Sequence, residues 1–287
     1  MPLSRKVLIR VIGAPILLGI LGAILYLDHR HQTMLGIVLL IVAVAVLSAV
    51  EFFKMAVARG IPVATIAGVC CVGFYLFPWE RVIEIPIWMA DWRVWVPTAL
   101  LLYLLVKLVF RYATFTPEAA ALTLLGYFYI GLLRFVAVPP VPARLGSFYL
   151  LFLLAAGKGS DMAAYVAGKT IGRHKMAPIV SPNKTWEGGI AGGVAGTVAG
   201  FAVLFWTRLH EKYAAVPWAA LLFFALIVTI AAQVGDLVKS AFKRWAGVKD
   251  SGRLLPEFGG MLDMVDSFLV AAPVAHIGTE IFRRTFG

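Results

Sequence analysis

The sequence predicts an all-α, polytopic integral membrane protein with about nine transmembrane helices, and two observations indicate this class. Hydrophobic residues make up 61% of the 287 residues and charged residues only 14%, whereas a soluble domain carries about 25% charged residues. The apolar residues also gather in long windows, and one membrane-spanning helix needs about 20 of them. Nine such helices account for nearly all the apolar residues, so a soluble globular protein is excluded.

Nine apolar windows supply the expected helices. In chain order they are 11–27, 34–50, 61–78, 95–110, 119–133, 147–168, 188–207, 218–233 and 261–282. The first window follows basic residues, as the apolar part of a signal peptide does, but it is long and no small-residue cleavage site follows it. We interpret it as a retained anchor. We expect residues 1–145 to form an N-terminal transmembrane region of about five spans, and residues 146–287 a C-terminal catalytic transmembrane region.

Basic side chains indicate the orientation of these helices. The formal net charge of +11 would suggest nucleic acid in a soluble protein, but membrane proteins collect Lys and Arg on their cytoplasmic loops. One side of the alternating connections carries fifteen Lys and Arg residues and the other nine. The richer side holds the N-terminus and the loops before residues 188 and 261. We therefore expect no nucleic-acid partner, and we expect a multi-pass protein of the cell (inner) membrane whose active-site loops face the cytoplasm.

Glycines and cysteines carry structural rather than catalytic signals. Four glycines of the seventh window repeat every fourth residue and share one helix face: Gly188, Gly192, Gly196 and Gly200. Such a face lets another helix approach closely. The partner helix can belong to the same chain or to a second copy, which leaves a homodimer open. Cys70 and Cys71 are adjacent in an apolar window and predict no disulfide framework.

The densest polar stretch lies where the eighth window ends and the ninth begins. If the eighth helix continues past the membrane surface, one of its faces carries residues at offsets of four, seven and eight. They are Asp236, Ser240, Lys243 and Arg244. Asp263 and Asp266 open the ninth window three residues apart. Because the two helices are antiparallel and joined on one side, we expect Asp236 and Asp263 to lie at similar depth and to face each other.

Paired carboxylates near water suit Mg²⁺, which keeps several waters and binds phosphate oxygens beside one or two carboxylates. The neighbouring Lys and Arg side chains suit phosphate groups. A proton or cation pathway fits carboxylates alone better than carboxylates interleaved with Ser, Lys and Arg. A solvated cytoplasmic loop explains the basic residues, but it does not explain Asp236, Asp263 and Asp266 at helix ends.

Two further constellations contain polar side chains. Ser181, Lys184 and Thr185 precede the glycine-rich window, and such donors ahead of a helix N-terminus form an anion cradle. Lys158 and Asp161 lie three residues apart inside the sixth window. They form either a structural ion pair or a pair whose Asp161 points into the same cavity, and both interpretations stay open. Glu51 is interpreted as a helix-end charge.

With these residues identified, the chain resembles the phosphatidate cytidylyltransferases, also called CDP-diacylglycerol synthases. The family signature combines Ser-x-x-Lys-Arg, Lys-Asp and Gly-Gly-x-x-Asp-x-x-Asp, and residues 240–244, 249–250 and 259–266 match it. A second motif, Ser-Pro-x-Lys-Thr-x-Glu-Gly, matches residues 181–188, and Asp161 with Ala164 and Tyr165 is similar to a third. The chain departs from the pattern at Phe258 and Met264, where the family commonly has His and Arg.

The resemblance implies a nucleotidyltransferase of phospholipid biosynthesis. Such an enzyme transfers a cytidylyl group from CTP to phosphatidic acid and gives CDP-diacylglycerol and pyrophosphate. The resemblance also implies Mg²⁺ as the cofactor, leaves a second, monovalent cation open, and implies CTP, phosphatidic acid and the lipid bilayer as partners. One alternative is a divergent paralogue of altered or weak activity, which Phe258 and Met264 motivate. Another is a cation-coupled transporter, which the lack of clear internal repeats disfavours.

The resemblance and the helix-end geometry assign the candidate site residues. The expected metal ligands are Asp236 and Asp263. The expected catalytic residues are Lys243, Arg244, Lys249, Asp250 and Asp266, of which the basic ones hold triphosphate or lipid phosphate and the acidic ones support or extend the metal site. The expected substrate-binding residues are Ser181, Lys184, Thr185, Ser240 and Asp161.

Overall fold

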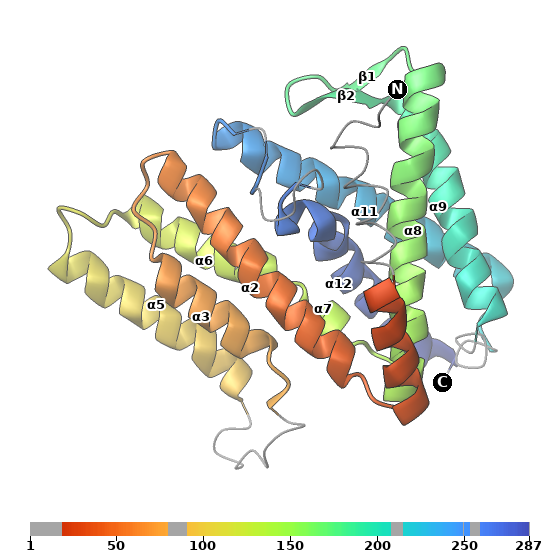
Figure 1. Cartoon of the computed structure of the whole chain (residues 1–287), viewed down its shortest axis with the longest axis horizontal. Coiled ribbons are helices and arrows are strands. Elements are labelled where there is room, and N and C mark those ends of the chain that lie inside the picture. Colours follow the sequence, from red (N-terminus) through yellow and green to blue (C-terminus); the bar gives the residue numbers. More distant parts are fainter. Residues whose placement is uncertain (1–18, 80–90, 208–214, 249, 253–258, 287) are drawn as a thin grey trace, which may run out of the picture. The chain divides into compact units, whose positions relative to one another are not determined.

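The structure, a computed structural model, describes residues 19–79, 91–207, 215–248, 250–252 and 259–286 (Figure 1). Helix predominates in these residues, which confirms the all-α membrane class. Residues 19–31 are helical, and the helices that follow are α2 (Leu35–Ala58), α3 (Thr65–Leu76), α5 (Trp92–Phe110), α6 (Pro117–Gly131), α7 (Arg134–Ala137), α8 (Ala143–Thr170), α9 (Trp186–Trp206), α11 (Trp218–Trp245) and α12 (Met261–Phe286). One small sheet joins β1 (Lys175–Ala177) to β2 (Ser181–Thr185).

Each of the nine predicted windows overlaps a helix of the described residues. Seven helices there are long and apolar enough to cross a membrane, with α6 and α7 counted together. The third window gives the shorter α3, of 12 residues. It ends early because Phe77 precedes Pro78 and is extended, with ψ 135°, the conformation that a following proline favours. The first window lies partly outside the described residues.

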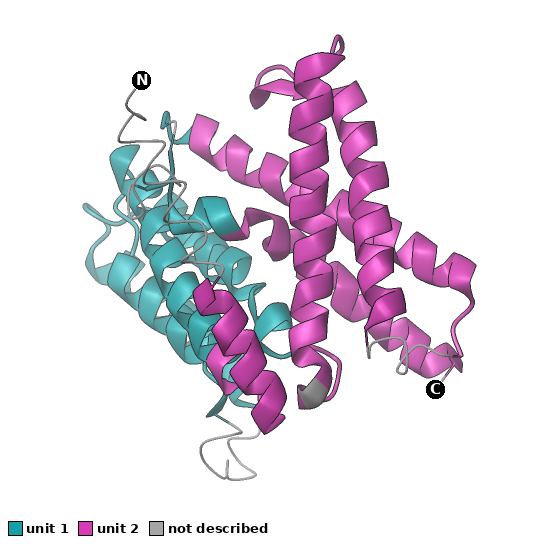
Figure 2. Cartoon of the chain, turned by 45° about the vertical axis from the view of Figure 1, so that its right-hand side comes forward, with its two compact units in different colours: residues 1–17, 38–138, 245–264 teal, residues 18–37, 139–244, 265–287 magenta. Residues whose placement is uncertain are grey.

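The chain forms two compact units, each assembled from separate stretches (Figure 2). Unit 1 comprises residues 1–17, 38–138 and 245–264, and unit 2 comprises residues 18–37, 139–244 and 265–287. Because α12 starts in unit 1 and continues in unit 2, the two units share that helix. The expected division into regions 1–145 and 146–287 stays a prediction.

Unit 1 packs α3 against α5 and α6 through aromatic side chains. The rings of Tyr75 and Trp92 lie 6.2 Å apart, and those of Tyr75 and Tyr127 lie 5.6 Å apart. Arg134 is buried beside them; its Nη1 donates to the Tyr75 carbonyl at 2.7 Å, and its guanidinium lies 5.2 Å from the ring centre of Trp92. These contacts compensate the burial of a charged side chain.

Unit 2 is organised around the glycine face of α9. A Cβ at Gly192 would lie 2.7 Å from the Ser160 carbonyl oxygen, and one at Gly196 would lie 2.5 Å from that of Ala156. The predicted close approach is therefore confirmed, and the partner is α8 of the same chain. Gln233 of α11 joins the pair, because its Nε2 donates to Ser160 Oγ at 2.9 Å and to the Gly189 carbonyl at 3.0 Å. The homodimer stays a prediction.

Helix α11 continues to Trp245, so it meets the condition under which Asp236, Ser240, Lys243 and Arg244 share one of its faces. Near its C-terminal third it touches α12 backbone to backbone, since a Cβ at Gly235 would lie 2.4 Å from the Asp266 carbonyl oxygen. This contact brings the polar turns of the two helices together.

The sequence did not predict the hairpin between α8 and α9. Its strands are antiparallel, with Lys175 opposite Thr185 and Ala177 opposite Ser181. Glu187, in the first turn of α9, accepts hydrogen bonds from the backbone N–H groups of Arg173 and His174 at 3.1 and 3.2 Å. The carboxylate thus ties the start of the hairpin to the start of α9.

Replacement of Gly196 by alanine should destabilise unit 2. The new Cβ would meet the Ala156 carbonyl oxygen at 2.5 Å and Thr229 Cγ2 at 2.6 Å, and such overpacking costs about 1–3 kcal/mol. Thermal unfolding of the purified protein in detergent should show a lower Tm. Gly193→Ala is the matched control, because its nearest neighbouring atom lies 3.9 Å away and alanine favours a helix by about 0.5–1 kcal/mol over glycine. Equal losses in both variants would contradict the packing described.

Candidate active site

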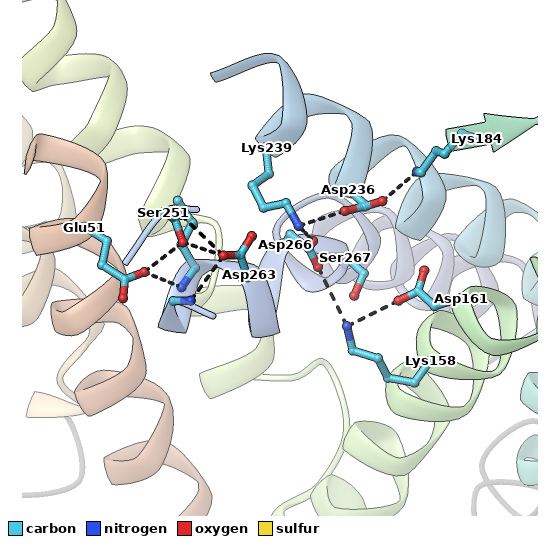
Figure 3. A network of polar contacts seen from close by, with 12 residues as sticks. Glu51, Lys158, Asp161, Lys184, Asp236, Lys239, Ser251, Asp263, Asp266 and Ser267 are labelled. Carbon is cyan, nitrogen blue, oxygen red and sulfur yellow. Dashed lines mark hydrogen bonds and ion pairs between the residues drawn. The ribbon is translucent and has the colours of Figure 1, made fainter. Parts of the chain in front are cut away.

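Charged side chains from α8, β2, α11 and α12 meet in one network of unit 2 (Figure 3). Cations and anions alternate along it in the order Asp161, Lys158, Asp266, Lys239, Asp236 and Lys184. Three positive and three negative groups balance one another. We name these six residues the charge network.

Asp236 uses both of its carboxylate oxygens in this network. Lys184 Nζ lies 2.7 Å from Oδ2, and Lys239 Nζ lies 2.8 Å from Oδ1. Asp236 and Lys239 are three residues apart on α11 and therefore share a face. Lys184 comes from β2, so the hairpin positions a cation over the carboxylate of α11.

Lys239 lies at the centre of the charge network. Its Nζ contacts Asp266 Oδ2 as well as Asp236, and its side chain is only 8% exposed. The side chain of Asp266 is 4% exposed, and its Oδ1 accepts a hydrogen bond of 2.6 Å from the Ser267 backbone N–H. Because isolated buried charges are very costly, each of these groups requires its partner.

Lys158 and Asp161 form the ion pair that their spacing predicts, with Nζ 3.3 Å from Oδ2. Both side chains are 39% exposed. Lys158 Nζ also lies 3.8 Å from Asp266 Oδ1. The pair is therefore part of the charge network, and Lys158 is more exposed than Lys239 at the centre of it.

A second polar cluster, in unit 1, surrounds the start of α12. Asp263 Oδ2 accepts hydrogen bonds from Ser251 Oγ at 2.8 Å and from the Gly260 backbone N–H at 3.2 Å. Ser251 Oγ also lies 3.2 Å from Glu51 Oε2. The loop that carries Ser251 is thus held to the first turn of α12.

Glu51 is buried, with 2% of the residue exposed, so its interpretation as a helix-end charge is wrong. It lies well inside α2 and accepts hydrogen bonds from the backbone N–H groups of Met261 and Leu262, both at 2.9 Å. These N–H groups begin α12 and have no partner within the helix. A carboxylate at this end also interacts favourably with the helix dipole. Glu51 therefore caps α12 from a distant part of the chain.

The model of the cytidylyltransferase family matches residues 8–282. The chain belongs to the cytidylyltransferase family. It is 38% identical to the phosphatidate cytidylyltransferase of Staphylococcus haemolyticus strain JCSC1435 over 164 residues, which are 57% of this chain and 60% of that protein. It is 42% identical to the phosphatidate cytidylyltransferase of Staphylococcus aureus strain COL over 132 residues, which are 46% of this chain and 49% of that protein. The match thus spans about half to three fifths of these relatives.

In unit 2 of this cytidylyltransferase family member, the charge network connects the Ser-Pro-x-Lys-Thr motif to Asp266 of the signature. Lys184 belongs to the Ser-Pro-x-Lys-Thr motif and Asp236 precedes the Ser-x-x-Lys-Arg signature, and their side chains are 2.7 Å apart. Thr185, from the first motif, is buried and caps α9, since its Oγ1 accepts a hydrogen bond of 3.2 Å from the Gly188 N–H. The sequence assigned Thr185 to substrate binding, and the structure gives it this capping contact.

The remaining predicted residues lie around these contacts. Ser181, Ser240 and Lys243 are partly buried, whereas Arg244 and Asp250 are exposed. Arg244 Nε donates to the Val180 carbonyl at 3.1 Å, which ties α11 to the hairpin. Lys249 and Phe258 lie outside the described residues. The expected pairing of Asp236 with Asp263 stays a prediction.

The family resemblance implies Mg²⁺, and the residues of unit 2 test that fit. Each of the four carboxylate oxygens of Asp236 and Asp266 already contacts a nitrogen donor. In the part of the chain that the structure describes, no group of three or more His, Cys, Asp and Glu side chains could hold a metal ion. Arranged in this way, Asp236 and Asp266 do not fit a divalent cation, and the Mg²⁺ requirement stays a prediction.

Sequence reasoning missed three residues of the two clusters. Lys239 carried a signal, because it follows Asp236 by three residues on a predicted helix. Ser251 directly follows the Lys-Asp pair of the signature and is not one of the residues that define the signature. Glu51 had no local signal, because its backbone partners lie 210 and 211 residues further along the chain.

Glu51→Gln should destabilise the protein through the start of α12. The new amide places its NH₂ group against the backbone N–H of Met261 or of Leu262, so that this donor loses its acceptor, and it also removes the charge. A buried donor without an acceptor lowers the stability by about 1–3 kcal/mol. Tm in detergent should fall. Glu118→Gln is the control, because Glu118 is exposed in the first turn of α6 and surface changes of this kind stay within about 0.5 kcal/mol. A Tm that is equal in the two variants would argue against the capping contact.

Proposed function

We propose that the protein transfers a cytidylyl group from CTP to phosphatidic acid and gives CDP-diacylglycerol and pyrophosphate. The observation that carries this proposal is the 2.7 Å contact between Lys184 and Asp236, because Asp236 connects through Lys239 to Asp266 and so joins the Ser-Pro-x-Lys-Thr motif to the signature. Membership of the cytidylyltransferase family and the names of the relatives support it.

The chemistry requires that two anions come together. A phosphate oxygen of the lipid attacks the α-phosphorus of CTP, a new P–O–P linkage forms, and pyrophosphate leaves. The protein has to position both substrates and stabilise the charge that develops between them. Lys184 and Lys158 suit this role, because their side chains are 28% and 39% exposed and end beside carboxylates. A phosphate oxygen can replace the carboxylate as the partner of each ammonium group.

The helices suit a lipid substrate. Phosphatidic acid keeps its acyl chains in the bilayer, and the charge network stands on α8, α11 and α12, which are long and apolar enough to cross a membrane. We place the network on the cytoplasmic side of the cell (inner) membrane, because the basic loops before residues 188 and 261 follow the charge bias of cytoplasmic loops.

Wild-type protein in lipid nanodiscs should incorporate labelled CTP into CDP-diacylglycerol when phosphatidic acid and Mg²⁺ are present. Asp263→Asn should abolish the product, because the expected metal carboxylate loses its charge. The measurement is separation of labelled lipid from free nucleotide. Inactivity of the folded wild type toward phosphatidic acid and other lipid phosphates would overturn the proposed function.

Lys184→Ala should lower kcat/KM for CTP by about a hundredfold, the typical effect of removing one preorganised electrostatic contact. Lys184→Arg keeps the charge and should recover part of the rate. Steady-state kinetics with varied CTP measures both effects. Lys54→Ala is the control, because Lys54 is an exposed cation outside both motifs; equal losses in Lys54→Ala and Lys184→Ala would contradict a specific role of Lys184.

A further inference from the structure

We infer that Lys239 is a built-in cation that bridges Asp236 and Asp266 and excludes divalent metal from this carboxylate pair. The inference rests on the proposed function only in treating the charge network as the reaction site. Lys239 is a positioning residue in this role, since it fixes two carboxylates rather than contacting a substrate.

The geometry places the ammonium where a bridging metal would lie. Lys239 Nζ is in contact with one oxygen of each carboxylate, at 2.8 Å from Asp236 Oδ1 and in a hydrogen bond with Asp266 Oδ2. Mg²⁺ binds carboxylate oxygens at about 2.0–2.1 Å. A metal shared by these two carboxylates would therefore occupy the position of the ammonium group, and the two cations exclude each other.

Burial holds Lys239 in place. The side chain is 8% exposed. The backbone contact of Gly235 with α12 and the hydrogen bond from the Ser267 N–H to Asp266 fix the surroundings of the two carboxylates. An ammonium that left the carboxylates without reaching water would lose its compensation, at high cost. Displacement by a metal therefore requires that α11 and α12 move apart or that the lysine finds new partners.

The charge balance favours the same conclusion. The charge network holds three ammonium groups and three carboxylates, so it is formally neutral. Addition of a divalent cation would leave two positive charges uncompensated within it. Removal of the Lys239 charge instead leaves one excess negative charge, which attracts a cation.

The test measures Mn²⁺ binding to the full-length protein in detergent, without CTP or lipid, by electron paramagnetic resonance of free Mn²⁺. The single substitution Asp266→Asn, with Lys239 present, should change the Mn²⁺ affinity by less than about twofold relative to the wild type. Lys239→Gln should bind Mn²⁺ about tenfold more tightly than the wild type. The double variant Lys239→Gln with Asp266→Asn should lose that gain, and Lys239→Arg should behave as the wild type.

Thermal unfolding supplies a second readout. Mn²⁺ should raise the Tm of Lys239→Gln and leave that of the wild type nearly unchanged, because a ligand stabilises the folded state that binds it. A folded Lys239→Gln variant with no gain in affinity would overturn the inference. So would a wild-type affinity that falls tenfold or more in Asp266→Asn, a comparison that holds even where Lys239→Gln does not fold. Because neither readout uses CTP, an inactive protein could still confirm the role of Lys239.

Discussion

The contact of Lys239 with two buried carboxylates is the interaction on which the candidate site depends. Asp236 and Asp266 lie on two apolar helices, and neither carboxylate could stay charged there without compensation. One ammonium group neutralises part of both, and Lys184 and Lys158 supply the remainder from β2 and α8. Ion pairs thus join four elements, and the two outer lysines are more exposed than Lys239.

Close helix packing makes these short contacts achievable. Glycines let the backbones of these helices approach closely. Gly192 and Gly196 of α9 lie against α8, and Gly235 of α11 lies against the Asp266 carbonyl of α12. With a larger residue at Gly235, α12 would move away from α11 and Lys239 would no longer reach both carboxylates. The small residues and the charged residues of these helices therefore act together, the first by setting the separation and the second by compensating the charge.

Helix positions were predictable from the sequence because hydropathy reports directly on what the bilayer requires, and in the described residues every apolar window overlaps a helix. Local spacing predicted the Lys158–Asp161 pair, because this pair depends on helix periodicity alone. The hairpin was missed because its polar strands, such as Ser181–Thr185, lack alternating hydrophobicity. The cap that Glu51 forms depends on tertiary packing between segments more than 200 residues apart, which no local pattern encodes.

Helix α12 shows two physical solutions to the burial of a carboxylate within its first two turns. Glu51 and Asp263 are held by backbone N–H groups and by the Ser251 hydroxyl near the helix N-terminus, where the dipole supplies about half a positive charge. Asp266, one turn later, no longer benefits from that terminus and accepts a full positive charge from Lys239 instead. The group that compensates each carboxylate therefore depends on how far the carboxylate lies from the N-terminus of α12. It explains why two aspartates only three residues apart, which look equivalent in the sequence, occupy different electrostatic environments.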